Sequence, residues 1–184
     1  YHIVAWMKRF TEIVCDMYSS RIKEPMKTVV ARPGNLYGPH DKFDWEKSKV
    51  IPALIRRAVE RHDPFEVWGD GMDLKDFLYI DDYIDGMLLA MEKLDEFQPI
   101  NIANGQAVTI REVLQEILIA AEYQDAPVEY DASKPTMIPK RMIDISLANE
   151  LLGWAPKVSI KEGIQKTLGW YRETYSDKVP EDAL

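Results

Sequence analysis

A short run of polar, glycine and proline residues follows a predicted strand near the start of the chain, at a place where a ligand could bind. The β-branched residues 28–30 (TVV) predict a buried strand, and RPGNLYGP at residues 32–39 ends it with proline and glycine. Ligands of open α/β sheets bind just beyond the carboxyl ends of strands, where Arg32, Asn35 and Tyr37 would lie. These eight residues alone favour an ordinary strand-to-loop turn, so the functional interpretation depends on the rest of the chain.

Charge along the chain favours a small anionic ligand. With 23 Lys and Arg against 31 Asp and Glu, the formal net charge is −8, which argues against general nucleic-acid binding. Basic residues nevertheless gather at residues 42–61 and 134–141. Local basic clusters on an acidic protein suit a diphosphate. The alternative is a solvated helix face, which we prefer for Arg61.

Composition bounds the class of protein. The chain has 184 residues, of which 46% are hydrophobic and 29% charged, as in one soluble globular domain. No apolar run approaches the length of a membrane span, so we expect no membrane partner. The single cysteine, Cys15, cannot form an internal disulfide, which fits the reducing cytoplasm. His2, His40 and His62 share no metal-ligand spacing, and we predict no metal site.

Strands alternate with helices along the chain, which predicts an α/β fold. Helices are expected at residues 3–19, 50–61, 81–93, 109–121, 146–153 and from 159 onward, and strands at residues 27–32, 66–68, 76–80, 100–102 and 128–130. Asp81 is the predicted N-cap of the third helix. Thr109 with Glu112, and Ser159 with Glu162, have the spacing of capping boxes.

Several motifs in order carry a resemblance to a known family. They are RPGNLYGP at residues 32–39, SKVIPALIRR at 48–57, VWGDG at 67–71 and DFLYIDD at 76–82. The set resembles the extended short-chain dehydrogenase/reductases, NAD(P)-dependent epimerases and dehydratases of nucleotide sugars, and most of all the GDP-L-fucose synthases. The resemblance runs from about residue 6 to residue 170.

The resemblance implies the carboxyl-terminal part of a Rossmann-type α/β fold with a smaller substrate-binding lobe. Residues 1–40 and about 76–102 would belong to the Rossmann sheet, and about 41–75 and 103–184 to the nucleotide-sugar-binding lobe. The chain begins with Tyr and has no glycine-rich phosphate loop. We therefore expect the amino-terminal dinucleotide-binding half to be absent, and this piece alone to be inactive.

Catalysis in the family is by hydride transfer to or from a nicotinamide, with a tyrosine as acid/base and a lysine four residues later. Lys8 matches the family lysine by its surroundings, but Val4 stands four residues before it. Tyr1 lies seven residues before Lys8, on nearly the same helix face, and is a candidate displaced acid/base. The alternative is that the proton donor has been lost.

The resemblance also assigns the remaining site residues. Lys8, Pro33, Asn35, Leu36 and Lys49 would contact NAD or NADP, and Asn35, Arg57, Trp68, Lys75 and Arg141 would contact the nucleotide sugar. Lys75 replaces a family arginine and so loses the bidentate fork for phosphate.

Two functions remain open on the sequence. The first is an NAD(P)-dependent nucleotide-sugar epimerase, reductase or dehydratase, and the second is a nucleotide-sugar-binding protein without catalysis. The sugar, the base and the choice between NAD and NADP stay open. The apolar stripe of the helix at residues 3–19 predicts a homodimer, as the family resemblance implies.

Overall fold

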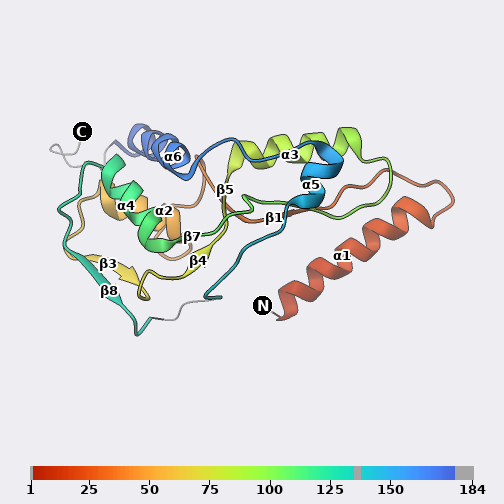
Figure 1. The fold of residues 1–184 in the computed structure, drawn as a ribbon. Helices are drawn as coiled ribbons and strands as arrows, with labels where there is room; N and C mark the ends of the chain where they lie inside the picture. The colour runs from red at the N-terminus through yellow and green to blue at the C-terminus, as the bar shows by residue number, and fades with distance from the viewer. Residues whose placement is uncertain (1, 135–137, 177–184) are drawn as a thin grey trace.

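In the computed structural model, which describes residues 2–134 and 138–176, six helices and eight short strands alternate (Figure 1). The helices are α1 (His2–Ser20), α2 (Val50–Val59), α3 (Ile80–Lys93), α4 (Ile110–Ala120), α5 (Ser146–Leu152) and α6 (Ile160–Thr174). The strands are β1 (Ala31–Pro33), β2 (Asn35–Tyr37), β3 (Phe65–Trp68), β4 (Leu74–Lys75), β5 (Phe77–Tyr79), β6 (Ile100–Ile102), β7 (Val108–Thr109) and β8 (Val128–Asp131). The α/β class is confirmed.

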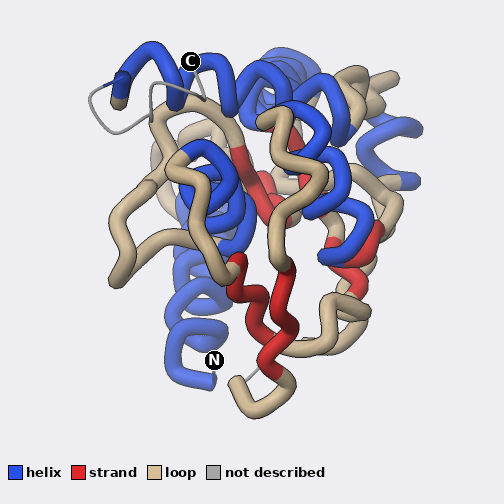
Figure 2. Tube along the Cα trace, turned by 90° about the vertical axis from the view of Figure 1, so that its left-hand side faces the viewer, coloured by secondary structure: helices blue, strands red, loops and turns tan. Residues whose placement is uncertain are grey.

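The strands pair two by two, and three of the four pairs are parallel. β1 lies parallel to β6, β2 to β5, and β3 to β8, while β4 and β7 are antiparallel. In the second pair Asn35 stands opposite Phe77. Parallel neighbours place their carboxyl ends at one edge, where ligands of open α/β sheets bind. Figure 2, turned by 90°, shows these short strands running between helices and long loops.

Two hydrophobic cores hold the chain together. The larger one joins α2, α4 and α6 to β3 and β5, and its largest fully buried side chains are Tyr171 and Phe65. The smaller one joins α3, α5 and β6 through Leu78, Ile102 and Trp154. In Figure 1 the first group of helices lies to the left and the second to the right. Helix α5 and Trp154 lie in the smaller core, although the family resemblance groups residues 103–184 with the lobe.

Local side-chain chemistry explains some of the helix ends. Thr109 and Glu112 form the predicted reciprocal capping box, and Gly153 ends α5 in the left-handed conformation. The predicted N-cap at Asp81 is wrong: α3 begins at Ile80, directly after β5, with Tyr79 as its N-cap residue. Asp81 instead lies in the first turn, where its charge complements the helix dipole.

Helix α1 stands apart from both cores and projects from the right-hand side of Figure 1. Its described residues include none that is buried. Glu12 anchors it by a bidentate pair with Arg32 of β1, at 2.7 and 2.8 Å. In the described part of the chain, no helix is long and apolar enough to cross a membrane.

Candidate functional site

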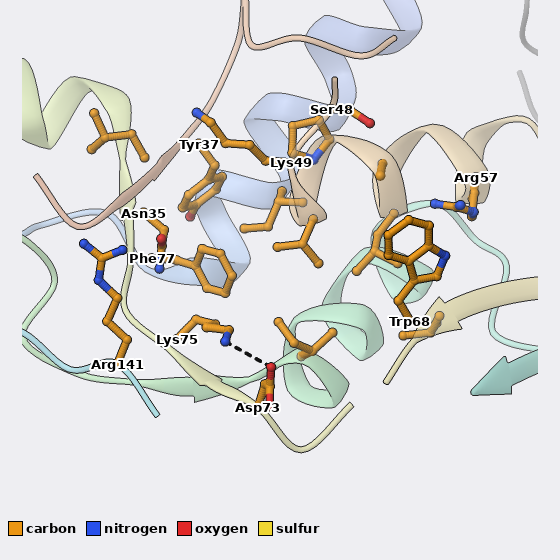
Figure 3. Close-up of a pocket in the computed structure, with 18 of the residues that line it drawn as sticks. Asn35, Tyr37, Ser48, Lys49, Arg57, Trp68, Asp73, Lys75, Phe77 and Arg141 are labelled. Carbon is orange, nitrogen blue, oxygen red and sulfur yellow. Dashed lines mark hydrogen bonds and ion pairs between the residues drawn. The ribbon is translucent and has the colours of Figure 1, made fainter. Parts of the chain in front are cut away.

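A cavity of about 540 Å³ opens where β2, β4 and β5 meet the first turns of α2 and the end of β3 (Figure 3). Its wall is largely apolar, with Ile51, Leu54 and Phe77 among its lining residues. Seven of the site residues expected from the sequence line it, namely Asn35, Leu36, Lys49, Arg57, Trp68, Lys75 and Arg141. Residues more than a hundred positions apart therefore converge on one space of ligand size.

Asn35 is held rigidly at the edge of the cavity. Its backbone N–H and its side-chain Nδ2 both donate to the carbonyl oxygen of Asp76, each at 2.9 Å. Only one of the two N–H groups of the side-chain amide is used in this way, so its second N–H and the Oδ1 atom remain as a donor and an acceptor for a ligand. The preceding Gly34 is required by close packing, since a Cβ there would lie 2.9 Å from Asp76 Oδ1.

The Asp76 carboxylate fastens two further loops to this point. It is fully buried and accepts hydrogen bonds from the backbone N–H groups of Asn104 at 2.8 Å, Gly105 at 3.0 Å and Ile143 at 3.3 Å. Burial raises the pKa of Asp76, while these three N–H donors and the nearby Arg141 oppose that rise. Sequence reasoning missed this residue as a functional candidate, although it opens the DFLYIDD motif.

Helix α2 supplies the cations on the opposite side. Lys49 is its N-cap residue and lies 3.6 Å from Asp41, with most of its side chain exposed. Arg57 sits two turns further on, half-buried, with its guanidinium 5.1 Å from the centre of the Trp45 ring. Burial lowers the pKa of Arg57, and Glu66 partly offsets this. Within the described residues, no ion pair engages Arg57.

Trp68 presents an open ring face at the end of β3. Its side chain is 56% exposed, and its indole N–H donates to Glu66 at 3.1 Å. The Lys134 ammonium lies 5.7 Å from the ring centre. A tryptophan fixed at one edge and open on its face can stack against a planar ligand group.

Lys75 and Arg141 are placed by a short pairing of distant segments. Leu74 donates to the carbonyl oxygen of Pro139 at 2.8 Å, and the Arg141 N–H donates to Leu74 at 2.9 Å. Lys75 donates to Asp73 at 3.0 Å, and also to the carbonyl oxygen of Ile138. The Arg141 guanidinium has no hydrogen bond or ion pair among the described residues. Sequence reasoning missed Asp73, although it stands two residues before Lys75, and residues at this spacing share a face of an extended segment.

Three expected residues do not line the cavity. Pro33 ends β1, paired with Ile102. Lys8 is exposed on α1, one turn before the Glu12 that binds Arg32. Tyr1 lies outside the described residues, so its orientation relative to Asn35 stays a prediction. In the part of the chain that is described, no three His, Cys, Asp or Glu side chains could hold a metal ion.

Comparisons with known proteins identify the family of this chain. Residues 5–103, more than half of the chain, match the model of the NAD dependent epimerase/dehydratase family. Probable GDP-L-fucose synthase 1 of Oryza sativa subsp. japonica is 38% identical over 164 residues, which are 87% of this chain and 49% of that protein. The chain thus spans about half the length of the curated relatives it matches.

Solved structures share the fold over nearly all of this chain. UDP-glucose 4-epimerase of Thermotoga maritima, solved with UDP-glucose, superposes with a TM-score of 0.79 at 30% identity, over 90% of this chain and 52% of that one. UDP-glucuronic acid 4-epimerase of Bacillus cereus, solved with UDP-glucuronic acid and NAD, gives a TM-score of 0.75 at 27% identity, over 89% and 50%. The chain therefore belongs to the NAD dependent epimerase/dehydratase family, with its Rossmann-type short-chain dehydrogenase/reductase fold.

Proposed function

We propose that the protein containing this chain is an NAD(P)-dependent enzyme that acts on a nucleotide sugar by hydride transfer with acid/base help. The observation that carries the proposal is the cavity beside Asn35, which joins an apolar wall to the arginines Arg57 and Arg141, neither of them in an ion pair within the described chain. Guanidinium groups without an internal partner are suited to the oxygens of a diphosphate.

Each lining residue has a part in this proposal. Arg57 and Arg141 bind the diphosphate, and the open face of Trp68 packs near the nucleotide. Lys75 adds one directed N–H donor, because Asp73 and Ile138 already take the others. Asn35 offers its Oδ1 acceptor where substrate and nicotinamide would meet.

The residues toward the nicotinamide fit one end of NAD or NADP. No ion pair engages Lys8 within the described chain, so its ammonium is available to a ribose hydroxyl. Pro33 and Leu36 flank Asn35 on β1 and β2, and Lys49 adds a second ammonium group. The nicotinamide supplies or accepts the hydride when it is bound. Tyr1 remains the proposed proton donor or acceptor.

Turnover of the protein containing this chain tests the proposal. The protein is incubated with GDP-mannose or UDP-glucose and with NAD or NADP, and sugar products are followed by NMR because an epimerase returns its cofactor unchanged. Tyr1→Phe should lower the rate by about 10²–10⁴-fold with substrate affinity kept, and Lys8→Ala should weaken cofactor binding as well. Full activity of Tyr1→Phe would remove Tyr1 from the mechanism.

The second candidate is a nucleotide-sugar-binding protein that has lost catalysis. It is favoured by Val4, which occupies the position four residues before Lys8 where the family has its tyrosine. Binding of nucleotide sugar by the wild-type protein without any turnover would support this candidate over the enzyme. The cytoplasmic location stays a prediction from the single cysteine.

We also propose a homodimer formed through α1. Its exposed apolar residues Ile3, Met7 and Phe10 are 75%, 65% and 67% exposed, and they follow helical spacing on one face. Such a face requires a cover in the assembled protein. Light scattering at micromolar concentration should give a dimer, and Phe10→Lys should shift it toward monomer. A wild-type monomer would contradict the proposal.

A further inference from the structure

Lys75 is a cation that an internal carboxylate has already neutralised. Its ammonium lies 3.0 Å from Asp73 Oδ2, and the two side chains are only 17% and 16% exposed. A second donor of the same ammonium is taken by the carbonyl oxygen of Ile138. An ion pair so far removed from water is screened little by salt, so the charge of Lys75 is largely cancelled inside the cavity.

Of the other cationic side chains that line the cavity, one is paired with a carboxylate and two are not. Lys49 lies 3.6 Å from Asp41 at the rim, whereas Arg57 and Arg141 have no ion pair within the described residues. In the view of Figure 3, Lys75 lies between these two arginines, with the dashed contact joining it to Asp73. The cavity therefore offers two guanidinium groups that make no direct ion pair within the described residues, although Glu66, which also lines the cavity, acts on Arg57 from further away, and Asp76 acts on Arg141.

The number of unpaired cations in the cavity affects which form of nucleotide binds more tightly. The diphosphate of a nucleotide sugar is esterified at both ends and carries two negative charges. A free nucleoside diphosphate ends in a phosphate monoester, whose second pKa is about 6, and so carries roughly one further negative charge at neutral pH. An unpaired Lys75 would add a third cation and so favour the free nucleoside diphosphate. The ion pair with Asp73 neutralises this cation.

We infer that Asp73 is a specificity-determining residue, which neutralises Lys75 so that the cavity prefers a nucleotide sugar to the free nucleoside diphosphate. This inference rests on the proposed function of the cavity. Asp73 itself lines the cavity and pairs with Lys75 there. Its effect is on the balance of charge in the cavity and not on the hydride transfer.

Calorimetric titration of the protein containing this chain tests the inference, with the pairs GDP and GDP-mannose, and UDP and UDP-glucose. The quantity compared is the ratio of the two affinities within the pair that binds. Asp73→Asn keeps the size of the side chain and removes its charge, so the ratio should shift toward the free nucleotide by at least about threefold. If the Asn variant does not fold, Asp73→Ser replaces it. This variant also lacks the charge, so we expect the same shift in the ratio.

Two control variants distinguish an effect of the Asp73 charge on the affinity ratio from a general disturbance of the cavity. Asp73→Asn combined with Lys75→Met removes both charges, and the ratio should return toward the wild-type value. Asp95→Asn removes a carboxylate that is 92% exposed and pairs with Lys27 on the surface, and the ratio should not change.

An unchanged ratio in Asp73→Asn, or equal weakening of both ligands, would overturn the inference while leaving the cavity as the nucleotide-sugar site. Failure of the double variant to restore the ratio would also overturn it, because the effect would not pass through Lys75. A wild-type protein that binds none of the four ligands would overturn the proposed function and this inference together.

Discussion

Asn35 donates twice to a single atom, the carbonyl oxygen of Asp76, through its backbone N–H and its side-chain Nδ2. The carboxylate of the same Asp76 holds the backbone at Asn104, Gly105 and Ile143. One buried residue therefore holds together strand β2, which carries the candidate ligand-binding amide of Asn35, and the two loops that contain Asn104–Gly105 and Ile143.

Removal of this carboxylate should destabilise the fold. Asp76→Ala leaves three backbone N–H groups without an acceptor, and a buried unsatisfied donor costs about 1–3 kcal/mol, so we expect a loss of about 3 kcal/mol or more. Asp76→Asn keeps one oxygen and should lose less. Urea denaturation followed by circular dichroism measures both. A free energy of unfolding equal to that of the wild type would show that Asp76 does not hold these loops.

A matched pair of glycines in α6 tests how this helix packs against the strand that bears Asn35. A Cβ on Gly163 would lie 2.1 Å from the hydroxyl oxygen of Tyr37, which is buried and cannot withdraw, whereas Gly169 has nothing within 4 Å. Gly163→Ala should therefore cost about 1–3 kcal/mol. Gly169→Ala should stabilise the helix by about 0.5–1 kcal/mol. Thermal unfolding of the two variants should shift in opposite directions, and equal shifts would contradict this packing.

The attachment of α1 should depend on pH through Glu12. The hydrogen bond from Arg32 is the main cause that lowers the pKa of Glu12 from 4.5 to about 2. A carboxyl with a depressed pKa stabilises the folded state above its ordinary pKa, and that contribution is lost as the pH falls from about 4.5 to about 2. Since Arg32 is 47% exposed, solvent screening reduces the contribution to about 1 kcal/mol.

Glu12→Gln measures this contribution directly. The free energy of unfolding should be lower than that of the wild type by about 1 kcal/mol at pH 7, and the difference should vanish near pH 2. A difference that stays constant over this range would show that Glu12 does not act through its charge.

The predicted fold agrees with the structure at several places that local chemistry decides, but the strand expected at residues 27–32 begins only at Ala31, and residues 28–30 are half-buried and not buried. The Thr109 capping box, the end of α5 at Gly153 and the strand Ile100–Ile102 were all predictable because each depends on a few neighbouring residues. Strands β2, β4 and β7 were not predicted, since two or three residues carry too little periodicity. The expected cap at Asp81 was wrong because β5 runs into α3 without an intervening turn.

The candidate site also has a part that the sequence predicts and a part that it does not. The family resemblance brought out Asn35, Arg57 and Arg141, which share the cavity. The contact of the Lys75 ammonium with the carbonyl oxygen of Ile138 could not be predicted, because it depends on how the segment at Ile138–Arg141 pairs with Leu74, far away in the sequence. Contacts between distant segments are fixed by packing and not by local propensity.

The most direct test of the central claim is the affinity of the protein containing this chain for a nucleotide sugar when one arginine of the cavity is removed. Calorimetric titration with GDP-mannose and UDP-glucose compares the wild type with Arg57→Ala, Arg141→Ala and the control Arg21→Ala, whose side chain is 71% exposed on the surface. The account predicts that each cavity variant loses about 1–3 kcal/mol of binding free energy, a fall of roughly 5–150-fold in affinity, while the control binds as the wild type. Unchanged affinity in both cavity variants would contradict the account.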